Sequence, residues 1–266
     1  MKIDSNGVHI HVRELGFDSA ETPALVFLHY WGGSSRTWDD VIAALPNVYR
    51  TIAPDHRGWG DSDQPASGYA LADLADDARR VIDALAPRRF VLIGHSMGGK
   101  VAQLLASRRP QGLAGLVLVA PSPPVPLSLP PEALAAMEGA YTSRASVEAT
   151  LDGMLSARPL SPARRQQVID DSLRGAAAAK TAWPRATSQE DISREVASIE
   201  VPTLVIAGEL DRVDSVATLE AELLPRVPQA VMHVLPGTGH LSPLESPDEI
   251  ATLIHAFTQR LGSSQR

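Results

Sequence analysis

Residues 90–99 of this 266-residue chain read FVLIGHSMGG, and this stretch decides the fold class. Phe90–Ile93 is a continuous apolar run bounded by turn signals, which is typical of a strand covered on both faces. A helical pattern follows directly and ends near Arg109. A serine between glycines in a strand–turn–helix context indicates a sharp turn that pushes the Ser96 hydroxyl out of the sheet edge. The alternative is a tight turn with an incidental serine, because the bare G-x-S-x-G pattern is common.

The glycines of this turn have a steric explanation. An abrupt change from strand to helix holds the central residue in a strained backbone conformation. Side chains at Gly94 and Gly98 would collide with this residue or with the neighbouring strand. The helix that begins after Ser96 also points its first N–H groups, which carry partial positive charge, toward the turn. We therefore expect the backbone N–H of Met97 to stabilise an oxyanion formed beside Ser96.

Short apolar runs alternate with helical patterns along most of the chain. Val8–Val12 alternates with polar residues like a half-exposed strand, whereas continuous apolar runs predict buried strands. The predicted buried strands are Ala24–Leu28, Phe90–Ile93, Leu116–Val119, Thr203–Ala207 and Val231–Leu235. Helices are expected from Leu71 to Leu85 and, after a capping box at 246–249, through Leu261. This alternation predicts an α/β fold with a mostly parallel central sheet and helices on both faces.

One stretch interrupts the alternation. Residues 121–131 contain six prolines, and no strand pattern follows until Val201. Short helices are expected in between, at Glu132–Tyr141, Ser146–Leu155 and Ala163–Leu173. We interpret 121–198 as an inserted helical cap over the carboxyl edge of the sheet, where ligands of α/β proteins bind. The core is then formed by 1–120 and 199–266, and the cap is not a separately folding domain, because the sheet is completed only after it.

Composition excludes several classes of function. Hydrophobic residues make up 44% and charged residues 21%, which excludes disorder as the main state. The net charge of −7 comes without a basic block, so we expect no nucleic acid and no anionic membrane surface as partner. No apolar run approaches the roughly 18 residues of a spanning helix. No apolar stretch follows Lys2, so no secretory signal is expected, and the cytoplasm is the default expectation.

The sequence also argues against cofactors and metals. The chain has no cysteine, which excludes disulfides, thiolate nucleophiles and zinc-thiolate sites. The glycine-rich nucleotide-binding patterns are absent, so no nucleotide cofactor is expected. His9 and His11 share one face of a strand, but no third ligand is evident, so no metal site is expected either. Oligomeric state does not follow from the sequence.

The motif Gly94-His95-Ser96-Met97-Gly98-Gly99 resembles the nucleophile turn of the α/β-hydrolase superfamily. The likeness extends from about Val8 to Leu261 and is greatest to small bacterial carboxylesterases and to cofactor-free perhydrolases. It implies an α/β-hydrolase fold and a catalytic triad whose members follow in the chain order serine, acid, histidine.

A serine hydroxyl is a weak nucleophile until a base takes its proton, so a histidine must lie within hydrogen-bond reach. Of the eight histidines, only His240 sits in a loop between the last predicted strand and the last helix. That loop, 236–241, reads PGTGHL and closely resembles the segment in which the family carries its base. The resemblance implies that His240 is the catalytic base rather than a surface histidine.

The base needs a carboxylate that fixes its tautomer and stabilises the imidazolium. The predicted strand Thr203–Ala207 is followed by GELD at 208–211, and the family carries its acid at the last residue of such a turn. The resemblance therefore implies Asp211, with Glu209 and Asp214 as competitors. Some relatives place the acid after the preceding strand, but residues 120–123, APSP, offer no carboxylate there.

The loop after Ala24–Leu28 reads HYWGG at 29–33 and resembles the family's H-G-x-x-G segment. The resemblance implies that the backbone N–H of Trp31 is the second oxyanion donor. Tyr30 replaces the usual glycine, which predicts a changed loop packing or pocket shape. We expect Tyr30 and Trp31 to contact substrate, with plain packing as the alternative. The segment 55–62 resembles a structural turn of the family and is assigned no catalysis.

Together these residues predict a serine hydrolase acting on carboxylic esters of small molecules with short or medium acyl chains. Ser96, His240 and Asp211 form the predicted triad, and Met97 and Trp31 the oxyanion hole. The alternatives are a perhydrolase, a lactonase or a C–C bond hydrolase that uses the same triad, since pocket lining decides among them. A small-molecule receptor on the same fold is a further alternative.

Overall fold

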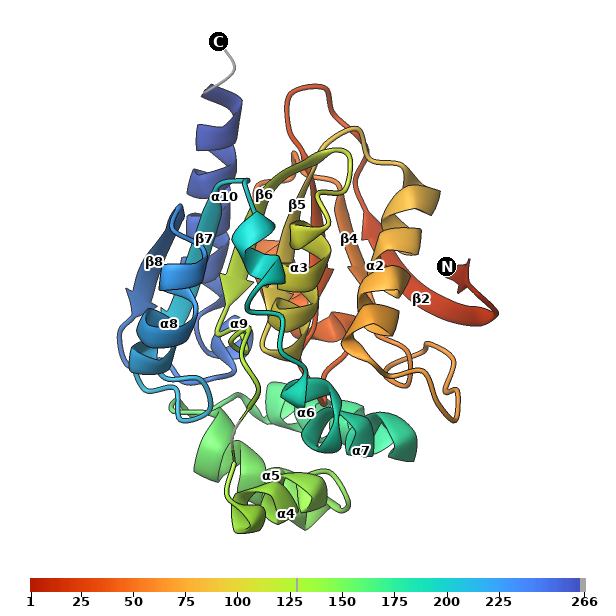
Figure 1. Ribbon diagram of the computed structural model, residues 1–266, viewed down its shortest axis with the longest axis vertical. Coiled ribbons are helices and arrows are strands. Elements are labelled where there is room, and N and C mark those ends of the chain that lie inside the picture. The colour runs from red at the N-terminus through yellow and green to blue at the C-terminus, as the bar shows by residue number, and fades with distance from the viewer. Residues whose placement is uncertain (128, 264–266) are drawn as a thin grey trace.

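The computed structural model describes residues 1–127 and 129–263, which contain one eight-stranded sheet (Figure 1). The strands are β1 (Lys2–Ser5), β2 (Val8–Leu15), β3 (Ala24–Leu28), β4 (Thr51–Pro54), β5 (Phe90–His95), β6 (Leu113–Val119), β7 (Thr203–Gly208) and β8 (Ala230–Leu235). Their order across the sheet is β1-β2-β4-β3-β5-β6-β7-β8. β2 pairs antiparallel with β1 and β4, and the other neighbours are parallel. The predicted mostly parallel sheet is confirmed.

Helices cover both faces of the sheet. Alternate residues of a strand point to opposite sides, so apolar side chains of the buried strands lie on both faces. In β3, Val26 and Leu28 pack in a hydrophobic cluster with residues of α2 (Leu71–Leu85) and α3 (Met97–Ser107). Leu25 and Phe27 pack in a second cluster with residues of α1 (Asp39–Ala44) and α10 (Pro247–Ser263). The remaining helical elements outside the 121–198 segment are α8 (Val216–Glu222), α9 (Ser242–Glu245), η1 (Ser35–Trp38) and η5 (Leu224–Arg226).

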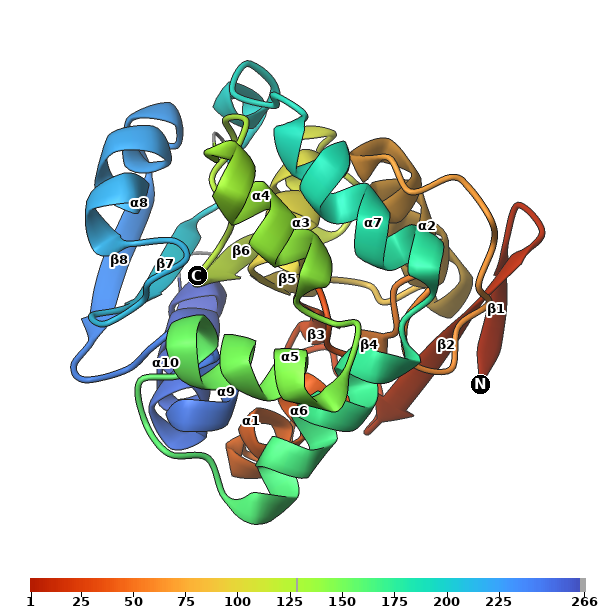
Figure 2. The same ribbon diagram turned by 90° about the horizontal axis from the view of Figure 1, so that it is seen from below.

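The chain between β6 and β7 forms a helical insertion at one end of the sheet. Its elements are α4 (Pro131–Gly139), α5 (Arg144–Thr150), η2 (Leu151–Leu155), α6 (Pro162–Arg174), α7 (Ala177–Arg185), η3 (Thr187–Gln189) and η4 (Glu195–Ser198). Figure 1 shows α4–α7 below the sheet, and Figure 2 shows them from below, in front of it. Tyr141 and Ile169 of this insertion belong to the same hydrophobic cluster as strand residues. The predicted mostly parallel α/β fold is thereby confirmed, and a helical insertion separates two neighbouring strands of its sheet.

Several elements differ from the expectation. The strands Lys2–Ser5 and Thr51–Pro54 and the helices α1, α7, α8 and α9 were not predicted. The capping box at 246–249 is wrong: α10 begins at Pro247, but the Ser246 hydroxyl accepts a hydrogen bond from Arg158 and contacts Thr238, each over 2.9 Å. The side chain that was expected to cap the helix instead links α10 to the insertion and to the preceding loop.

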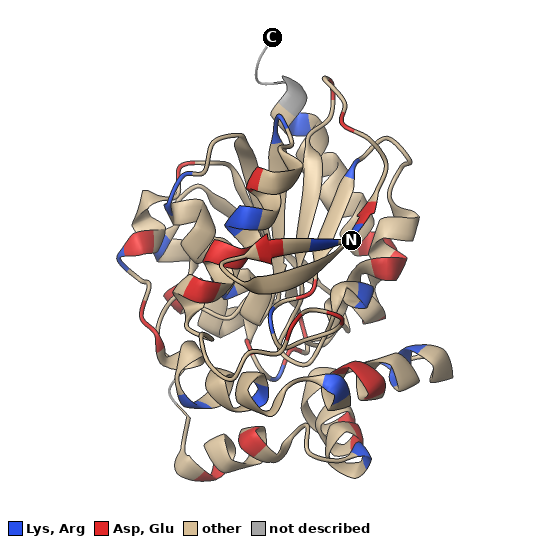
Figure 3. Ribbon diagram, turned by 90° about the vertical axis from the view of Figure 1, so that its right-hand side faces the viewer, with Lys and Arg blue, Asp and Glu red and all other residues tan. Residues whose placement is uncertain are grey.

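The surface carries charges of both signs side by side. Figure 3 colours basic residues blue and acidic residues red, and on the side shown the two are interspersed. Many of them pair, as Arg165 does with Asp152 over 2.5 Å and Arg185 with Glu138 over 2.7 Å within the insertion. Among the helices formed by 1–127 and 129–263, none is long and apolar enough to span a membrane.

Candidate active site

The turn between β5 and α3 holds Ser96 at φ 52° and ψ −114°, a left-handed backbone conformation that non-glycine residues rarely adopt. A Cβ atom at Gly94 would come within 2.3 Å of the Gly98 carbonyl oxygen, and one at Gly98 within 2.5 Å of the Leu28 carbonyl oxygen. Both glycines are therefore required by close backbone contacts, as the motif predicted. The strained serine begins a helix whose first N–H groups face the same turn.

Ser96, His240 and Asp211, which the sequence places far apart, form one hydrogen-bonded chain. The Ser96 hydroxyl lies 2.9 Å from His240 Nε2, and His240 Nδ1 lies 2.9 Å from Asp211 Oδ2. The other oxygen of Asp211 accepts hydrogen bonds from the backbone N–H groups of Val213 and Asp214. Because Asp211 Oδ1 is fixed by the backbone, Oδ2 is held toward the imidazole.

The two competing carboxylates have other positions. Glu209 is exposed and accepts a hydrogen bond from the Gly237 N–H over 2.7 Å. Asp214 is buried and lines the pocket beside Ser96 and His240. Of these carboxylates, only that of Asp211 is bonded to His240.

Charge around His240 favours its protonated form. Burial disfavours a charged imidazole, but the Asp211 carboxylate beside it raises the pKa of His240 above the ordinary value, with further support from Asp214 and Glu245. Asp211 therefore has the electrostatic effect that a histidine base requires, because it stabilises the imidazolium that forms when the base accepts a proton.

His95 has a structural role that was not predicted. Its Nε2 donates a hydrogen bond to the backbone carbonyl of His240 over 2.8 Å, and the two rings lie 5.3 Å apart. Burial, together with the nearby His240, keeps the pKa of His95 well below its ordinary value, so the ring is neutral. Its position next to the nucleophile was the only sequence signal that pointed to it.

The loop after β3 presents a free N–H group at Trp31. The carbonyl of Tyr30 accepts hydrogen bonds from His29 Nδ1 over 2.7 Å and from the Gly33 N–H over 3.1 Å. This carbonyl and the Trp31 N–H belong to the same peptide unit, so these bonds also fix the direction of the N–H. In the part of the chain that the structure describes, neither the Trp31 nor the Met97 N–H donates to a protein acceptor. Both predicted oxyanion donors are thus available.

The insertion holds this loop from the other side. The Tyr141 hydroxyl donates to the Trp31 carbonyl over 3.0 Å, and the Ser172 hydroxyl donates to the Gly32 carbonyl over 3.0 Å. A Cβ atom at Gly32, where φ is 97°, would come within 2.5 Å of the Tyr141 ring. The insertion and the loop with the predicted oxyanion donor are therefore packed as one unit.

A cavity of about 290 Å³ lies between the triad and the insertion. Tyr30 and Trp31 line it together with Ser96 and His240, and their predicted contacts with substrate stay a prediction. Most of the other lining residues are apolar, among them Leu127, Leu129, Met137, Leu155, Trp183 and Val213. Among the described residues, Ser122, Thr150, Arg212 and Asp214 add polar groups to the lining. This composition is typical of a small-molecule site with a few polar contacts.

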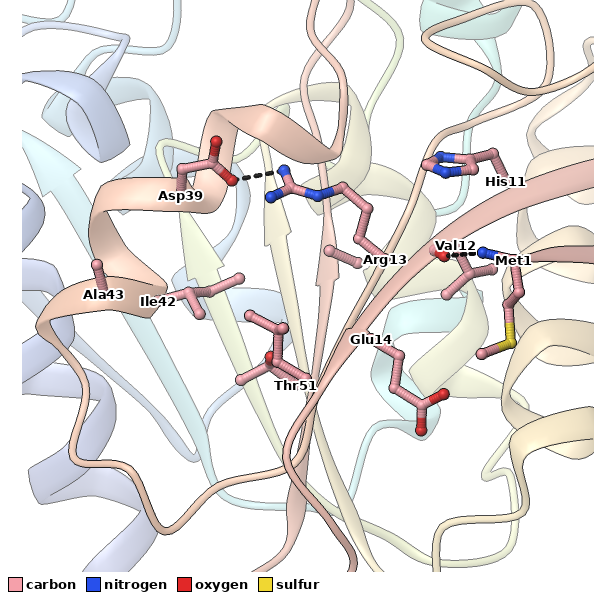
Figure 4. Close-up of a pocket in the computed structure, with 11 residues that line it drawn as sticks. Met1, His11, Val12, Arg13, Glu14, Asp39, Ile42, Ala43 and Thr51 are labelled. Carbon is pink, nitrogen blue, oxygen red and sulfur yellow. Dashed lines mark hydrogen bonds and ion pairs between the residues drawn. The ribbon is translucent and has the colours of Figure 1, made fainter.

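A larger surface hollow of about 490 Å³ lies beside β2 and α1 (Figure 4). Arg13 and Asp39 form an ion pair across it over 2.5 Å, with Ile42 nearby. None of the triad residues lines this hollow. Its two most prominent charges, those of Arg13 and Asp39, neutralise each other, and it lies apart from Ser96 and His240, so we assign it no catalytic role.

The sequence placed no third ligand near His9 and His11, and the structure corrects this for His11. Among the residues that the structure describes, His11, Asp55 and Asp61 offer ligand atoms within 4.8 Å of one another. The Asp55 carboxylate, however, already accepts hydrogen bonds from the N–H groups of Ser35 and Asp61 and contacts His11 Nδ1. Asp61 in turn pairs with an arginine of the insertion. The cluster is therefore explained by hydrogen bonds and an ion pair that stabilise the 55–62 turn.

Comparison with known proteins agrees with this geometry. The profile described as "Alpha/beta hydrolase family" matches residues 25–253. A 2-(acetamidomethylene)succinate hydrolase of Mesorhizobium japonicum is 28% identical, over 93% of this chain and 90% of that protein. A non-heme chloroperoxidase of Streptomyces lividans is 32% identical, over 83% of this chain and 86% of that protein. An esterase from Exiguobacterium antarcticum has the same fold, with a TM-score of 0.88 at 22% identity, over 97% of this chain and 98% of that one. The chain belongs to the alpha/beta hydrolase family.

Proposed function

We propose that this chain is a serine hydrolase that cleaves carboxylic esters of small molecules through an acyl-enzyme intermediate. The observation that carries the proposal is the hydrogen-bonded chain Ser96–His240–Asp211 at the edge of a mostly apolar pocket. A serine with strained backbone, a base in contact with its hydroxyl and an acid in contact with the base together meet the requirements of nucleophilic catalysis.

The geometry supports the following sequence of steps. His240 Nε2 accepts the proton of the Ser96 hydroxyl as its oxygen attacks the ester carbonyl carbon. The carbonyl oxygen becomes an oxyanion, and the free N–H groups of Met97 and Trp31 stabilise it. His240 then gives its proton to the leaving alcohol as the ester C–O bond breaks. Water, deprotonated by His240, attacks the acyl carbon, and His240 returns the proton to the Ser96 oxygen as the bond to the acyl group breaks and the acid leaves. Asp211 stabilises the imidazolium in both halves of the reaction.

We assign substrate selection to the insertion, 121–198, acting as a cap. It contributes Met137, Leu155 and Trp183 to the pocket, opposite Ser96. A volume of about 290 Å³ suits a small ester, which supports the preference for short or medium acyl chains. Tyr30 and Trp31, at the border between the triad and the insertion, are the proposed substrate contacts beside the reacting carbonyl.

Perhydrolysis is the second candidate function, because a relative at 32% identity is described as a non-heme chloroperoxidase. Hydrogen peroxide would then replace water in the second half of the reaction, attacking the acyl group on Ser96 and releasing a peracid. The same triad serves both reactions, so the rates with the two nucleophiles decide between them.

The test is hydrolysis of p-nitrophenyl esters from acetate to decanoate by the wild type, by Ser96→Ala and by Ser107→Ala. Ser107 lies at the far end of α3, where its hydroxyl donates to the Leu104 carbonyl, so it is a matched control for loss of a serine. We expect sustained turnover by the wild type and the control, and none by Ser96→Ala. Equal rates in all three proteins, or a single modification without turnover, would contradict the esterase proposal. Repeating the assay with peroxide and measuring the peracid formed distinguishes perhydrolysis from hydrolysis.

A further inference from the structure

Asp214 lies in the pocket with an unused carboxyl group. It is 2% exposed and lines the cavity together with Ser96 and His240. Its side chain accepts no hydrogen bond from the part of the chain that the structure describes. Asp211, on the same turn, has both oxygens bonded, and the carboxylate of Glu209 is bonded to the Gly237 N–H. Its oxygens are not fully enclosed by protein atoms, so this carboxyl group without a protein partner faces the open volume of the cavity, where a bound molecule can reach it.

The groups around Asp214 do not provide a partner. The nearby Lys100 ammonium donates to the carbonyls of Val125 and Ser188, each over 3.0 Å, rather than to Asp214. His240 and Asp211 act on Asp214 through their charges, and they are bonded to each other. Burial raises the pKa of Asp214 to about 7, although the charge of His240 acts to lower it. The carboxyl group is therefore held in the pocket without being neutralised by an ion pair.

Asp214 places a carboxyl group without a protein partner in a mostly apolar pocket. Most of its residues are apolar, and the Thr150 hydroxyl is already bonded to the Ser146 carbonyl. Ser122, which follows β6 as Asp214 follows β7, is buried, and its hydroxyl also has no hydrogen-bond partner among the described residues. Since β6 and β7 are neighbours, these two polar groups lie at the ends of adjacent strands.

We propose that Asp214 is a substrate-recognition residue that accepts a hydrogen bond from an O–H or N–H group of the substrate close to the scissile ester. The preferred substrates are then small esters that carry such a donor near the reacting carbonyl, rather than plain alkyl esters. The donor must be close to the ester, because Asp214 lines the same small cavity as Ser96 and His240. This inference rests on the proposed esterase function and specifies its substrate class.

The test compares pairs of esters in which a hydroxyl replaces a methyl group of similar size. The pairs are methyl 2-hydroxypropanoate with methyl 2-methylpropanoate, methyl 3-hydroxybutanoate with methyl 3-methylbutanoate, and 2-hydroxypropyl butanoate with 2-methylpropyl butanoate. The first two place the donor in the acyl group, and the third places it in the alcohol. The kcat/KM ratio within each pair is measured by titration of released acid at pH 8, where Asp214 is mostly ionised.

Four proteins are compared: wild type, Asp214→Leu, Asp214→Asn and Glu209→Gln. Asp214→Leu removes the acceptor at similar size, and Asp214→Asn keeps one acceptor oxygen without charge. Glu209→Gln removes a charge from the same turn outside the pocket, so it is the control for a purely electrostatic effect. A ratio within one variant is independent of the fraction of that variant that is folded.

We expect the wild type and Glu209→Gln to prefer the hydroxyl ester of at least one pair by about tenfold or more. Asp214→Leu should lose this preference, and Asp214→Asn should retain part of it. The inference is overturned if the wild type shows no preference in any pair, or if Asp214→Leu keeps the preference. If Ser96-dependent hydrolysis of p-nitrophenyl butanoate is still seen, the proposed function stands in either case. Absence of Ser96-dependent ester hydrolysis would overturn the proposed function and this inference together.

Discussion

His95 donates a hydrogen bond from Nε2 to the backbone carbonyl of His240 over 2.8 Å. The residue before the nucleophile therefore holds the loop that carries the base, although the two are 145 residues apart in the sequence. In the proposed reaction His240 contacts both Ser96 and Asp211, so a small displacement of its loop lengthens both hydrogen bonds. His95 is thus a positioning residue that acts through His240.

Replacing His95 with Phe keeps a ring of similar size and removes the donor. We expect kcat on p-nitrophenyl butanoate to fall about tenfold with little change in KM, because the loss affects alignment in the transition state more than ground-state binding. His95→Gln, whose amide can donate, should recover part of kcat. If both variants lose the same amount of kcat, and this loss parallels a drop in Tm, the role of His95 is merely structural.

Asp211→Asn tests whether Asp211, rather than another carboxylate of the same turn, is the acid that supports His240. The amide cannot stabilise the imidazolium and favours the wrong tautomer of His240, so we expect kcat to fall by about 10²–10⁴. Glu209→Gln, which alters an exposed carboxylate on the same turn, should stay within about twofold of the wild type. Steady-state kinetics on one ester, with Tm as a folding check, gives both values. A larger loss in Glu209→Gln than in Asp211→Asn would contradict the assignment.

The pH profile should depend on Asp214. His240 must be neutral to accept the Ser96 proton, and its raised pKa places the acidic limb of kcat/KM above about pH 6.5. Asp214 is ionised above its pKa of about 7, and its negative charge then stabilises the imidazolium, as do those of Asp211 and Glu245. Asp214→Asn removes this charge and therefore lowers the pKa of His240. The acidic limb should therefore move to lower pH with p-nitrophenyl butanoate, which carries no hydrogen-bond donor. An unchanged limb, or one moved to higher pH, would contradict this electrostatic account.

Lys100 connects both ends of the insertion to helix α3. Its buried ammonium donates to Val125 before α4 and to Ser188 after α7. Lys100→Met leaves two carbonyls without their charged donor, and we expect unfolding free energy to fall by about 2–3 kcal/mol. Lys2→Met, which removes an exposed ion pair with Asp63, should cost less than about 1 kcal/mol. Urea denaturation compares the two, and equal small effects would show that Lys100 does not hold the insertion.

The triad could be predicted from the sequence because its signals are local. The strained turn at Ser96 requires glycines at fixed positions, and Asp211 and His240 follow the last two strands in the chain order of the family. Of these strands β7 is buried as expected, whereas β8 at the edge of the sheet is mostly exposed or half-buried, so its predicted burial is wrong. The contact of His95 could not be predicted, because its partner is a backbone carbonyl, which leaves no side-chain pattern. Likewise, the different roles of Asp211 and Asp214 depend on side-chain directions within one turn.

Two of the elements that were not predicted, α7 and β4, have weak periodicity. Helix α7 contains Pro184 and three consecutive alanines, so it shows no clear apolar stripe, although Trp183 and Ala179 are buried. Strand β4 has only four residues and ends in Pro54. Its place in the sheet comes from pairing with β2 and β3 on either side. Tertiary packing rather than local preference decides both elements.

The central claim is that Ser96 is the nucleophile of a turnover enzyme. The most direct measurement titrates the wild type and Ser96→Ala with a fluorophosphonate, counts the label per chain by intact mass, and locates it by peptide mapping. The account predicts one label per chain, on Ser96, with ester hydrolysis lost in proportion to labelling and no label on Ser96→Ala. Label on another residue, or ester hydrolysis that survives full labelling of Ser96, would contradict it.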